Sequence, residues 1–494
     1  MNIRPMKDYN FWFVTGSQLL YGPQTLAQVE EHSRLMASAL DASEYIPCKV
    51  VCVPVMKSTE EITKLIKDAN YDDTCAGIIT FMHTFSPSKM WIDGLELLQK
   101  PFCHLHTQFN RKIPNLEIDM DFMNLNQSAH GDREHGFIGA RLRIPRKVIA
   151  GYWEDDNVQR RLGDWMRVAC GVAVSKNLSV MRFGDNMREV AVTEGDKVQA
   201  QKVFGWKVNT WPVGQLADMI NEISNTEVDT LLEEYREKYI FNTNDLESVV
   251  YQAKEEIAIE RMLKQNKCGA FSNTFEDLYG MKQLPGLASQ RLMEKGYGYG
   301  GEGDWKTAAM THVIKAMAEG KNGGSSFMED YTLDLTLDEE LSLGAHMLEV
   351  CPTIAADKPK IEVHNLGIGG KNPPARLVFE GKAGDAILVS VVDMGGRFRM
   401  IVHDIKCVKP ILDMPNLPVA RVMWTPEPNL LTGSECWILA GGAHHATLTY
   451  DVTAAQMRDF ARILGIEFLH ITKSTVIESF EDQLSISDLY WKLK

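Results

Sequence analysis

The chain has 494 residues, of which 45% are hydrophobic and 24% charged, and its formal net charge is −14. This composition is typical of a soluble globular protein and excludes a disordered, collagen-like or coiled-coil chain. The length exceeds what one compact core usually holds, so we expect several domains. An acidic chain without a long basic run is a poor candidate for binding nucleic acid or an anionic membrane.

The first residues and the cysteines indicate the compartment. The N-terminal sequence lacks the basic and long apolar regions of a signal peptide. No apolar run approaches the length of about 18 residues that a membrane span needs. The nine cysteines are scattered singly without a C-x-x-C pair, which is typical of reduced, mostly buried thiols. We therefore expect a cytoplasmic protein with no membrane partner.

The first 110 residues alternate between short apolar runs and helical stretches. The strand-like runs cover residues 11–15, 50–55, 76–82 and 102–106. Near-continuously apolar strands separated by helices predict a parallel sheet that is covered on both faces. Such sheets bind ligands beyond the carboxyl ends of their strands, and Gln18, His83 and Gln108 fall in that kind of position.

The rest of the chain changes its pattern twice. A second α/β stretch begins near Leu178, and after about residue 340 short strands alternate with turn residues, as in an antiparallel sheet or barrel. We therefore place domain boundaries near residues 177 and 324. The later strands are expected at residues 361–363, 376–379, 386–392, 397–402 and 436–439, followed by an amphipathic helix at residues 454–464.

Residues 296–301 (GYGYGG) satisfy the G-x-G-x-x-G pattern of dinucleotide-binding loops. That pattern needs a buried strand directly before it, whereas a polar, helix-like stretch at residues 287–295 precedes it here. We interpret these residues as a glycine loop that permits the close approach of other groups, rather than as a dinucleotide site.

Two acids and two histidines, far apart in the sequence, could share a metal ion. Glu302 stands between two glycines, and Glu329 lies among small and apolar residues. His346 lies in an apolar run, and the adjacent His444 and His445 follow one that ends in glycines. Taken singly, the acids have a simpler interpretation as helix caps or solvated groups, and the histidines as hydrogen-bonded core residues. Together they suit a divalent ion such as Mn²⁺, and a carboxylate acid–base pair without a metal is the alternative.

Such a site fits the transfer of a carbonyl group between adjacent carbons of a polyol. A base removes the proton next to the carbonyl, and a cation bridging the two oxygens stabilises the enediol that forms. Glu302 and Glu329 could both bind the cation and act as the acid–base pair. Further side chains could hold a sugar by stacking or by hydrogen bonds to its hydroxyls: Trp91, Phe275, Tyr297, Tyr299, Trp305, Gln18, His130 and Asn186.

Long motifs spread over the whole chain match one known family. They lie at residues 12–22 (WFVTGSQLLYG), 83–91 (HTFSPSKMW), 106–110 (HTQFN), 119–131 (DMDFMNLNQSAHG), 182–192 (RFGDNMREVAV), 274–287 (TFEDLYGMKQLPGL), 301–305, 327–331, 346–352 and 439–445. On these motifs the chain resembles the L-arabinose isomerases from end to end.

The resemblance implies a fold and an activity. The fold would be an α/β subunit of three domains: an N-terminal α/β domain at residues 1–176, a central α/β domain at residues 177–324 and a C-terminal β-rich domain at residues 325–494. Both α/β domains would be built on parallel sheets. The activity would be the conversion of L-arabinose to L-ribulose through an enediol, usually with one Mn²⁺ per subunit, and often a slower conversion of D-galactose to D-tagatose.

The resemblance also assigns roles to residues. The metal ligands would be Glu302, Glu329, His346 and His445, and the two glutamates would be the catalytic acid–base pair. The sugar-contacting positions would be Gln18, Leu20, His130, Met187, Phe275 and Ile368. The subunits would assemble as trimers paired into a hexamer, with N-terminal residues of one subunit completing a neighbour's site.

Two positions depart from the family pattern, and two other functions stay open. Leu19 stands where the family commonly has His, and Tyr152 stands where a G-H-W pattern is usual; neither is an expected metal ligand. An isomerase of another sugar, such as L-fucose, is the nearest alternative. A non-catalytic sugar-binding protein is the other, although the basic module of a DNA-binding regulator is missing from the sequence.

Overall fold

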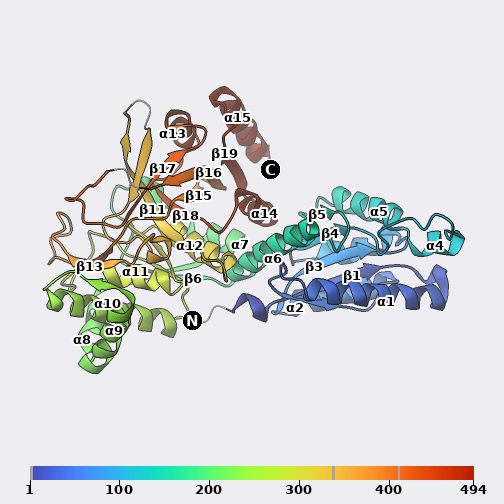
Figure 1. Ribbon diagram of the computed structural model, residues 1–494, viewed down its shortest axis with the longest axis horizontal. Helices are drawn as coiled ribbons and strands as arrows, with labels where there is room; N and C mark the ends of the chain where they lie inside the picture. The colour runs from blue at the N-terminus through green and yellow to red at the C-terminus, as the bar shows by residue number, and fades with distance from the viewer. Residues whose placement is uncertain (1–3, 337–339, 410–411, 494) are drawn as a thin grey trace. The chain divides into compact units, whose positions relative to one another are not determined.

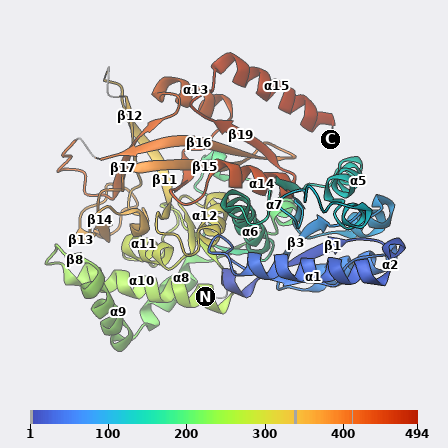
Figure 2. The same ribbon diagram turned by 45° about the vertical axis from the view of Figure 1, so that its right-hand side comes forward.

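The computed structural model describes residues 4–336, 340–409 and 412–493 (Figures 1 and 2). The chain divides into two compact units, Arg4–Ala173 and Val174–Lys494. The expected boundary near residue 177 lies close to this division. The further boundary near residue 324 falls inside the second unit and stays a prediction.

The first unit is built on a five-stranded parallel sheet with the order β2-β1-β3-β4-β5. Every residue of the central strand β3 is buried, as expected for a strand covered on both faces. The strands are β1 (Asn10–Gly16), β2 (Lys49–Cys52), β3 (Cys75–Met82), β4 (Phe102–His106) and β5 (Lys147–Ala150). The helices are α1 (Gly22–Asp41), α2 (Thr59–Tyr71), α3 (Ile92–Leu97), α4 (Met120–Leu125), α5 (Ser128–Arg141) and α6 (Asp156–Lys176).

Two separate apolar cores lie on the two faces of this sheet. On one face, Phe11 and Phe13 pack with residues of α1 and α6, including Met36 and Trp165. On the other face, Val14 packs with residues of α2, α3 and α5. The strand order reverses between β1 and β3, and the carboxyl ends of strands at such a point are where open α/β sheets bind ligands.

The second unit contains a smaller parallel sheet with the order β10-β9-β6-β7. The strands are β6 (Ser179–Phe183), β7 (Lys207–Trp211), β9 (Ala270–Ser272) and β10 (Gly298–Gly300). The helices are α7 (Lys197–Phe204), α8 (Val213–Glu222), α9 (Asn225–Lys238), α10 (Leu246–Gln265), α11 (Gly286–Glu294) and α12 (Trp305–Met317). Two parallel-sheet α/β regions are therefore present, as the sequence predicts.

The glycine-rich run at residues 296–301 contains strand β10 and lies against helix α12. A side chain on Gly298 would place its first carbon 2.0 Å from the Ala308 carbonyl oxygen, and one on Gly300 would place it 2.2 Å from the Asp304 carbonyl oxygen. The glycines are thus explained by the close approach of α12, without a bound dinucleotide.

The C-terminal part of the second unit is a seven-stranded, mostly antiparallel sheet with the order β15-β18-β11-β12-β17-β16-β19. Strand β15 pairs with both β18 and β16, so the strands close on themselves like a barrel. The strands are β11 (Ser325–Asp334), β12 (Leu341–Ala345), β15 (Gly384–Asp393), β16 (Phe398–Val408), β17 (Arg421–Pro426), β18 (His445–Thr449) and β19 (Glu467–Ile471). A small sheet beside it contains β8 (Ile240–Phe241), β13 (Lys360–Val363) and β14 (Ala375–Val378).

The β-rich character of this part confirms the sequence prediction, and so does helix α14 (Ala454–Leu464). The strand expected at residues 436–439 is wrong, because these residues end helix α13 (Leu430–Leu439). The side chain of Asn429 caps this helix by accepting a hydrogen bond from the Thr432 N–H. The last helix is α15 (Ile477–Leu493). Within the described residues, no helix is both long and apolar enough to cross a membrane.

Candidate active site

Glu302 lies in the tight turn between strand β10 and helix α12. Its backbone is left-handed, with a φ of 58°, which is uncommon for a residue with a side chain. The Met187 N–H donates to the Glu302 carbonyl oxygen at 3.0 Å, and the Gly303 N–H donates to the Asn273 carbonyl oxygen at 2.8 Å. These contacts hold the turn and fix the direction of the Glu302 side chain. A strained backbone held in this way is typical of a functional position.

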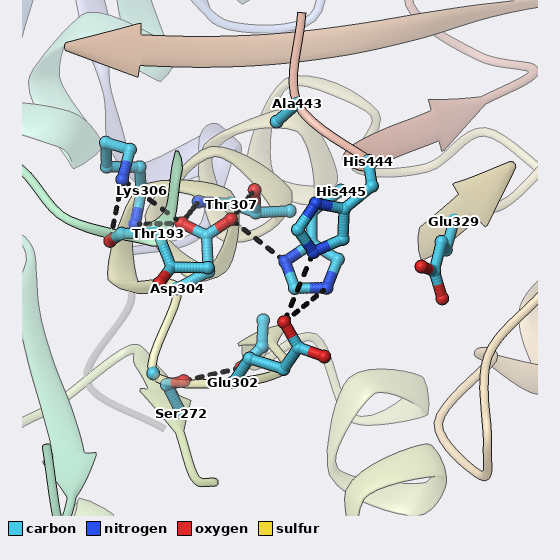
Figure 3. Close-up of polar contacts among 12 residues, drawn as sticks. Thr193, Ser272, Glu302, Asp304, Lys306, Thr307, Glu329, Ala443, His444 and His445 are labelled. Atoms are coloured by element: carbon cyan, nitrogen blue, oxygen red, sulfur yellow. Dashed lines mark hydrogen bonds and ion pairs between the residues drawn. The ribbon is translucent and has the colours of Figure 1, made fainter. Parts of the chain in front are cut away.

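Two consecutive histidines reach Glu302 from the start of strand β18 (Figure 3). The distance from the Glu302 Oε2 atom is 3.2 Å to His444 Nε2 and 3.9 Å to His445 Nε2. Ligand atoms of these three residues all lie within 4.8 Å of one another. The turn and the strand therefore build a group with both oxygen and nitrogen donors.

The pairing of strands in the C-terminal sheet brings Glu329 and His346 to the same place. Glu329 on β11 lies opposite His445 of β18 and, on its other side, opposite Ala345 of β12. His346 directly follows β12, and its Nε2 atom lies 4.0 Å from Glu329 Oε2. The rings of His346 and His445 have their centres 5.8 Å apart. The four expected metal ligands thus lie in one region, hereafter the Glu–His cluster, of Glu302, Glu329, His346 and His445. Among the described residues, the group whose ligand atoms all lie within 4.8 Å of one another contains Glu302 and His445 but not Glu329 or His346.

A carboxylate outside the cluster contacts the Nδ1 atom of each histidine of the cluster. The His445 Nδ1 atom lies 3.2 Å from Asp304 Oδ2, and the His346 Nδ1 atom lies 2.5 Å from Glu349 Oε2. Because an ionised carboxylate can only accept, the proton of each ring is placed on Nδ1 and the Nε2 lone pair is left toward the cluster. Partners of this kind orient metal-binding histidines.

Asp304 and Glu349 are in turn fixed by their own contacts. Asp304 caps α12 by accepting from the Lys306 and Thr307 N–H groups, and its other oxygen accepts from the Thr307 hydroxyl. Glu349 accepts from the hydroxyl of Tyr299 at 3.1 Å. Both carboxylates are buried. The role of these two carboxylates was not predicted from the sequence; the available signals were an acid just before a helix and an acid three residues after His346.

The charges in the cluster are set by these neighbours. The hydrogen bond from His444 holds the pKa of the Glu302 carboxyl below its usual value, and the same bond raises the pKa of His444. Burial opposes ionisation of Asp304, but the Lys306 ammonium and the His445 hydrogen bond outweigh it, so the pKa of Asp304 falls well below its ordinary value. Burial lowers the pKa of His445. His445 is therefore suited to act as a neutral ligand.

These residues fit a divalent cation. The Nε2 atom of His445 is buried and has no hydrogen-bond partner among the described residues, which is costly unless another group binds it. The carboxylate nearest to this Nε2 atom is that of Glu302, at 3.9 Å. An ionised carboxylate accepts hydrogen bonds but donates none, so it cannot pair with the Nε2 lone pair. His444 differs, because its Nε2 atom already donates to Glu302. Two carboxylates and two imidazole lone pairs suit a cation such as Mn²⁺, and His445 fits the ligand role better than His444.

Three of the expected sugar-contacting residues belong to the second unit. The backbone of Met187 contacts Glu302, and the Phe275 ring lies 5.9 Å from the His346 ring. Ile368 is 37% exposed. The next residue, Gly369, lies close to Phe275: a Cβ atom added to Gly369 would be 3.8 Å from the Phe275 carbonyl oxygen. All three therefore lie beside the Glu–His cluster or next to a residue that does.

The other three expected sugar contacts belong to the first unit. Gln18 and Leu20 follow strand β1, and Leu20 is 84% exposed. His130 lies in the first turn of α5 and packs on the Phe85 ring, with ring centres 4.6 Å apart. The Tyr21 hydroxyl donates to the Gln127 side chain at 3.3 Å. The loop after β1 and the start of α5 are therefore neighbours at one edge of the sheet.

The other side chains proposed to bind a sugar have structural roles. Trp91, Tyr297, Tyr299 and Trp305 are buried core residues, so their proposed stacking on a ligand is wrong. Asn186 is buried as well, and its side chain is already bound to Arg182, Thr193 and Gly303. Only Phe275 of the proposed aromatic residues is partly exposed beside the cluster.

Comparison with known proteins gives matches over nearly the whole chain. Sequence models of the L-arabinose isomerase N-terminal, central and C-terminal domains match residues 5–177, 179–320 and 324–467. The chain is 55% identical over 493 residues to the L-arabinose isomerase of Geobacillus stearothermophilus. It is 54% identical over 495 residues to that of Anoxybacillus flavithermus and 53% identical over 490 residues to that of Thermotoga petrophila. Each alignment covers 99% of both chains.

Proposed function

The chain belongs to the L-arabinose isomerase family and is an aldose–ketose isomerase, and we propose that it converts L-arabinose to L-ribulose at the Glu–His cluster. The observation that carries the proposal is the convergence of Glu302, Glu329, His346 and His445 from separate elements of the second unit. The first two supply acids for proton transfer, and all four supply donors for a divalent cation.

The reaction moves one proton between two carbons and another between two oxygens of the sugar. We propose that Glu302 and Glu329 divide this work, one exchanging the carbon proton and the other the hydroxyl proton. Both side chains are partly exposed, at 18% and 20%, so a sugar can reach them. A Mn²⁺ ion, when bound, would polarise the two neighbouring oxygens of the sugar.

The histidines and their carboxylates do not need to move during such a reaction. Asp304 and Glu349 hold the Nδ1 protons of His445 and His346, so both Nε2 atoms stay directed at the cluster. His444 donates from Nε2 to Glu302 and can hold or return a proton at that carboxylate. The His445–Asp304 and His346–Glu349 contacts are buried, which strengthens them.

We propose that the sugar is also contacted by Met187, Phe275 and Ile368 around the cluster, and by Gln18, Leu20 and His130 of a neighbouring subunit. Segments at the carboxyl edge of the first unit's sheet carry exposed apolar side chains: Leu19, Leu20, Ile113, Leu116 and Met120. Exposed apolar groups of this number are typical of a surface that another molecule covers. This supports a homo-oligomer, for which we propose a hexamer of paired trimers. The scattered, odd number of cysteines supports a reducing, cytoplasmic location.

D-Galactose is the second substrate that we propose. It has the configuration of L-arabinose at C2, C3 and C4 and carries one more hydroxymethyl group. The reacting carbons would therefore meet the same acids, while the additional group would have to fit at the far end of the pocket. We expect a slower conversion to D-tagatose.

The test is a ketose assay on the metal-stripped protein. L-Arabinose, D-galactose and L-fucose are supplied separately, and Mn²⁺, Mg²⁺ and Co²⁺ are restored one at a time. The proposal predicts L-ribulose from L-arabinose, fastest with Mn²⁺, and incorporation of solvent deuterium at the carbon that receives the proton. A preference for L-fucose would contradict the proposed substrate. Undiminished turnover without any metal would contradict the proposed requirement for a divalent cation. Absence of solvent deuterium from the product would favour a hydride shift. No ketose from any sugar would favour a non-catalytic sugar-binding protein.

A further inference from the structure

Lys306 is a lysine that lies almost completely inside the second unit. It stands in the first turn of α12, four residues after Glu302, and is 1% exposed. Its Nζ atom donates to the Thr193 carbonyl oxygen at 2.8 Å (Figure 3). It also donates to the Glu194 carbonyl oxygen at 2.6 Å. The third neighbour is Asp304 Oδ1, at 3.6 Å. The ammonium group is thus surrounded by oxygens of the protein.

A charged lysine at this position lowers the stability of the fold unless its hydrogen bonds compensate for the cost. The first turn of a helix favours negative charge, because the helix dipole is positive there. Burial also disfavours the charged form and lowers the pKa of Lys306. An apolar side chain of similar length would fill the same volume without either cost, but it could not donate to two backbone carbonyls.

The carbonyls that Lys306 binds belong to a segment that touches Glu302. The segment comprises residues 184–196, between β6 and α7, and we call it the covering segment. At its start, the Met187 N–H donates to the Glu302 carbonyl oxygen. At its end, the Asp196 N–H donates to Asp393 Oδ2 at 2.7 Å. Lys306 binds the part between these two attachments.

Asn186 connects the two halves of the covering segment to the turn of Glu302. Its amide nitrogen donates to the Thr193 carbonyl oxygen at 2.7 Å and to the Gly303 carbonyl oxygen at 3.4 Å. The approach is so close that a side chain on Gly303 would lie 2.5 Å from the Asn186 Cα atom. A chain of contacts therefore runs from Lys306 through Thr193 and Asn186 to the backbone on which Glu302 is built.

We propose that Lys306 is a positioning residue of the isomerase site: it holds the covering segment against the turn that carries Glu302, and thereby keeps the left-handed backbone of Glu302 and the position of Met187. The reasoning rests on the proposed function only in giving Glu302 a catalytic role. The contacts themselves do not depend on a sugar or a metal. Loss of the ammonium should therefore loosen the covering segment in the metal-free protein as well.

The experiment compares Lys306→Met with Asn186→Ala, which breaks the same chain of contacts at a second point. Lys382→Met is the matched control, because Lys382 Nζ also donates to three backbone carbonyls, those of Asn322, Gly323 and Thr353, none of which contacts the Glu–His cluster. Hydrogen exchange of metal-free protein is followed by mass spectrometry for peptides covering residues 184–196. Steady-state kcat and KM are then measured with Mn²⁺ and L-arabinose.

We expect Lys306→Met and Asn186→Ala to speed exchange of the covering segment by about tenfold or more, with little change in the strands of the C-terminal sheet. A displacement of Glu302 by a fraction of an ångström should lower kcat/KM by about 10- to 100-fold, mostly through kcat. Lys382→Met should change neither quantity in this way. If Lys306→Met does not fold, Asn186→Ala decides the outcome alone.

Wild-type exchange of the covering segment in either folded variant, or wild-type kcat and KM, would overturn the assignment. A general rise of exchange over the whole unit, with kcat lowered as much by Lys382→Met, would also overturn it, since the role would then be structural only. Failure of the proposed function gives a different result: the wild-type protein itself would form no ketose, while the exchange difference between the variants would persist.

Discussion

Replacing Asp304 with Asn tests how the protein prepares His445 for a metal. Asp304 uses one oxygen to accept from the Lys306 and Thr307 N–H groups and the other to accept from the Thr307 hydroxyl and His445 Nδ1. In Asp304→Asn, the amide oxygen can keep the cap, because Asn is as good a cap as Asp. The NH₂ group must then face His445 Nδ1, and two donors would oppose each other.

The expected result follows from the proton that His445 would have to move. To accept from the new NH₂ group, the ring must place its proton on Nε2, which is the atom needed for the cation. Loss of such a supporting partner typically lowers metal affinity by about 10- to 100-fold, or roughly 1.4–2.7 kcal/mol of binding free energy. The thermal midpoint of the metal-free protein should fall as well, because the cap of α12 remains but the buried Lys306 ammonium loses the carboxylate charge that lies 3.6 Å from it.

The assay is a Mn²⁺ titration of metal-stripped protein, in which the electron paramagnetic resonance signal reports the free ion. Asp196→Asn is the matched control, since Asp196 also caps a helix, α7, but has no contact with a histidine of the cluster. Equal Mn²⁺ affinity in the wild type and in Asp304→Asn would refute the reasoning. So would an equal loss in Asp196→Asn.

Other changes should separate the roles within and around the cluster. Glu302→Gln and Glu329→Gln should each lower kcat by about 10²- to 10⁴-fold while circular dichroism and the thermal midpoint stay close to wild type; near-wild-type turnover would remove the acid–base assignment. His445→Ala should lose bound Mn²⁺ by elemental analysis, whereas His444→Ala should retain it and lose turnover, and the reverse pattern would exchange their roles. Leu116→Glu places a charge on a side chain that is 94% exposed, so it should shift the sedimentation coefficient toward smaller species if this surface is covered in an oligomer, and an unchanged value would count against that interface.

Strand and helix patterns predicted the architecture well, and short apolar runs caused the errors. The alternation before residue 110 predicted a parallel sheet, and β1 to β4 belong to it. The central strand β3 is buried along its whole length, whereas the edge strand β2 is only partly buried. Residues 436–439 looked like a strand but end α13, since four apolar residues do not distinguish a buried strand from the last turn of a buried helix. The cap at Asn429, seven residues earlier, was the missed signal.

The site was harder to infer because its residues meet only through the fold. Glu302 and His444 are 142 positions apart, and the pairing of β11 with β18 is what sets Glu329 opposite His445. Family resemblance, not spacing, was the basis for expecting these residues as ligands. Asp304 could be anticipated as a helix cap, but the hydrogen bond of its second oxygen to His445 depends on the placement of β18.

The structure also corrects the residues chosen by type alone. Tyr299 and Trp305 have rings that could stack on a sugar, yet both are buried, and Tyr299 instead donates to Asn273 and Glu349. Asn186 has an amide that could bind hydroxyl groups, but its hydrogen bonds go to Arg182, Thr193 and Gly303. Burial decided these roles, and it depends on contacts that no local pattern contains.

The most direct measurement is anomalous diffraction at the manganese edge from crystals soaked in Mn²⁺. The account predicts one strong peak in the second unit, within coordination distance of carboxylate oxygens of Glu302 and Glu329 and of the Nε2 atoms of His346 and His445. A peak coordinated by His444 in place of His445, or one at a site without the two glutamates, would contradict it.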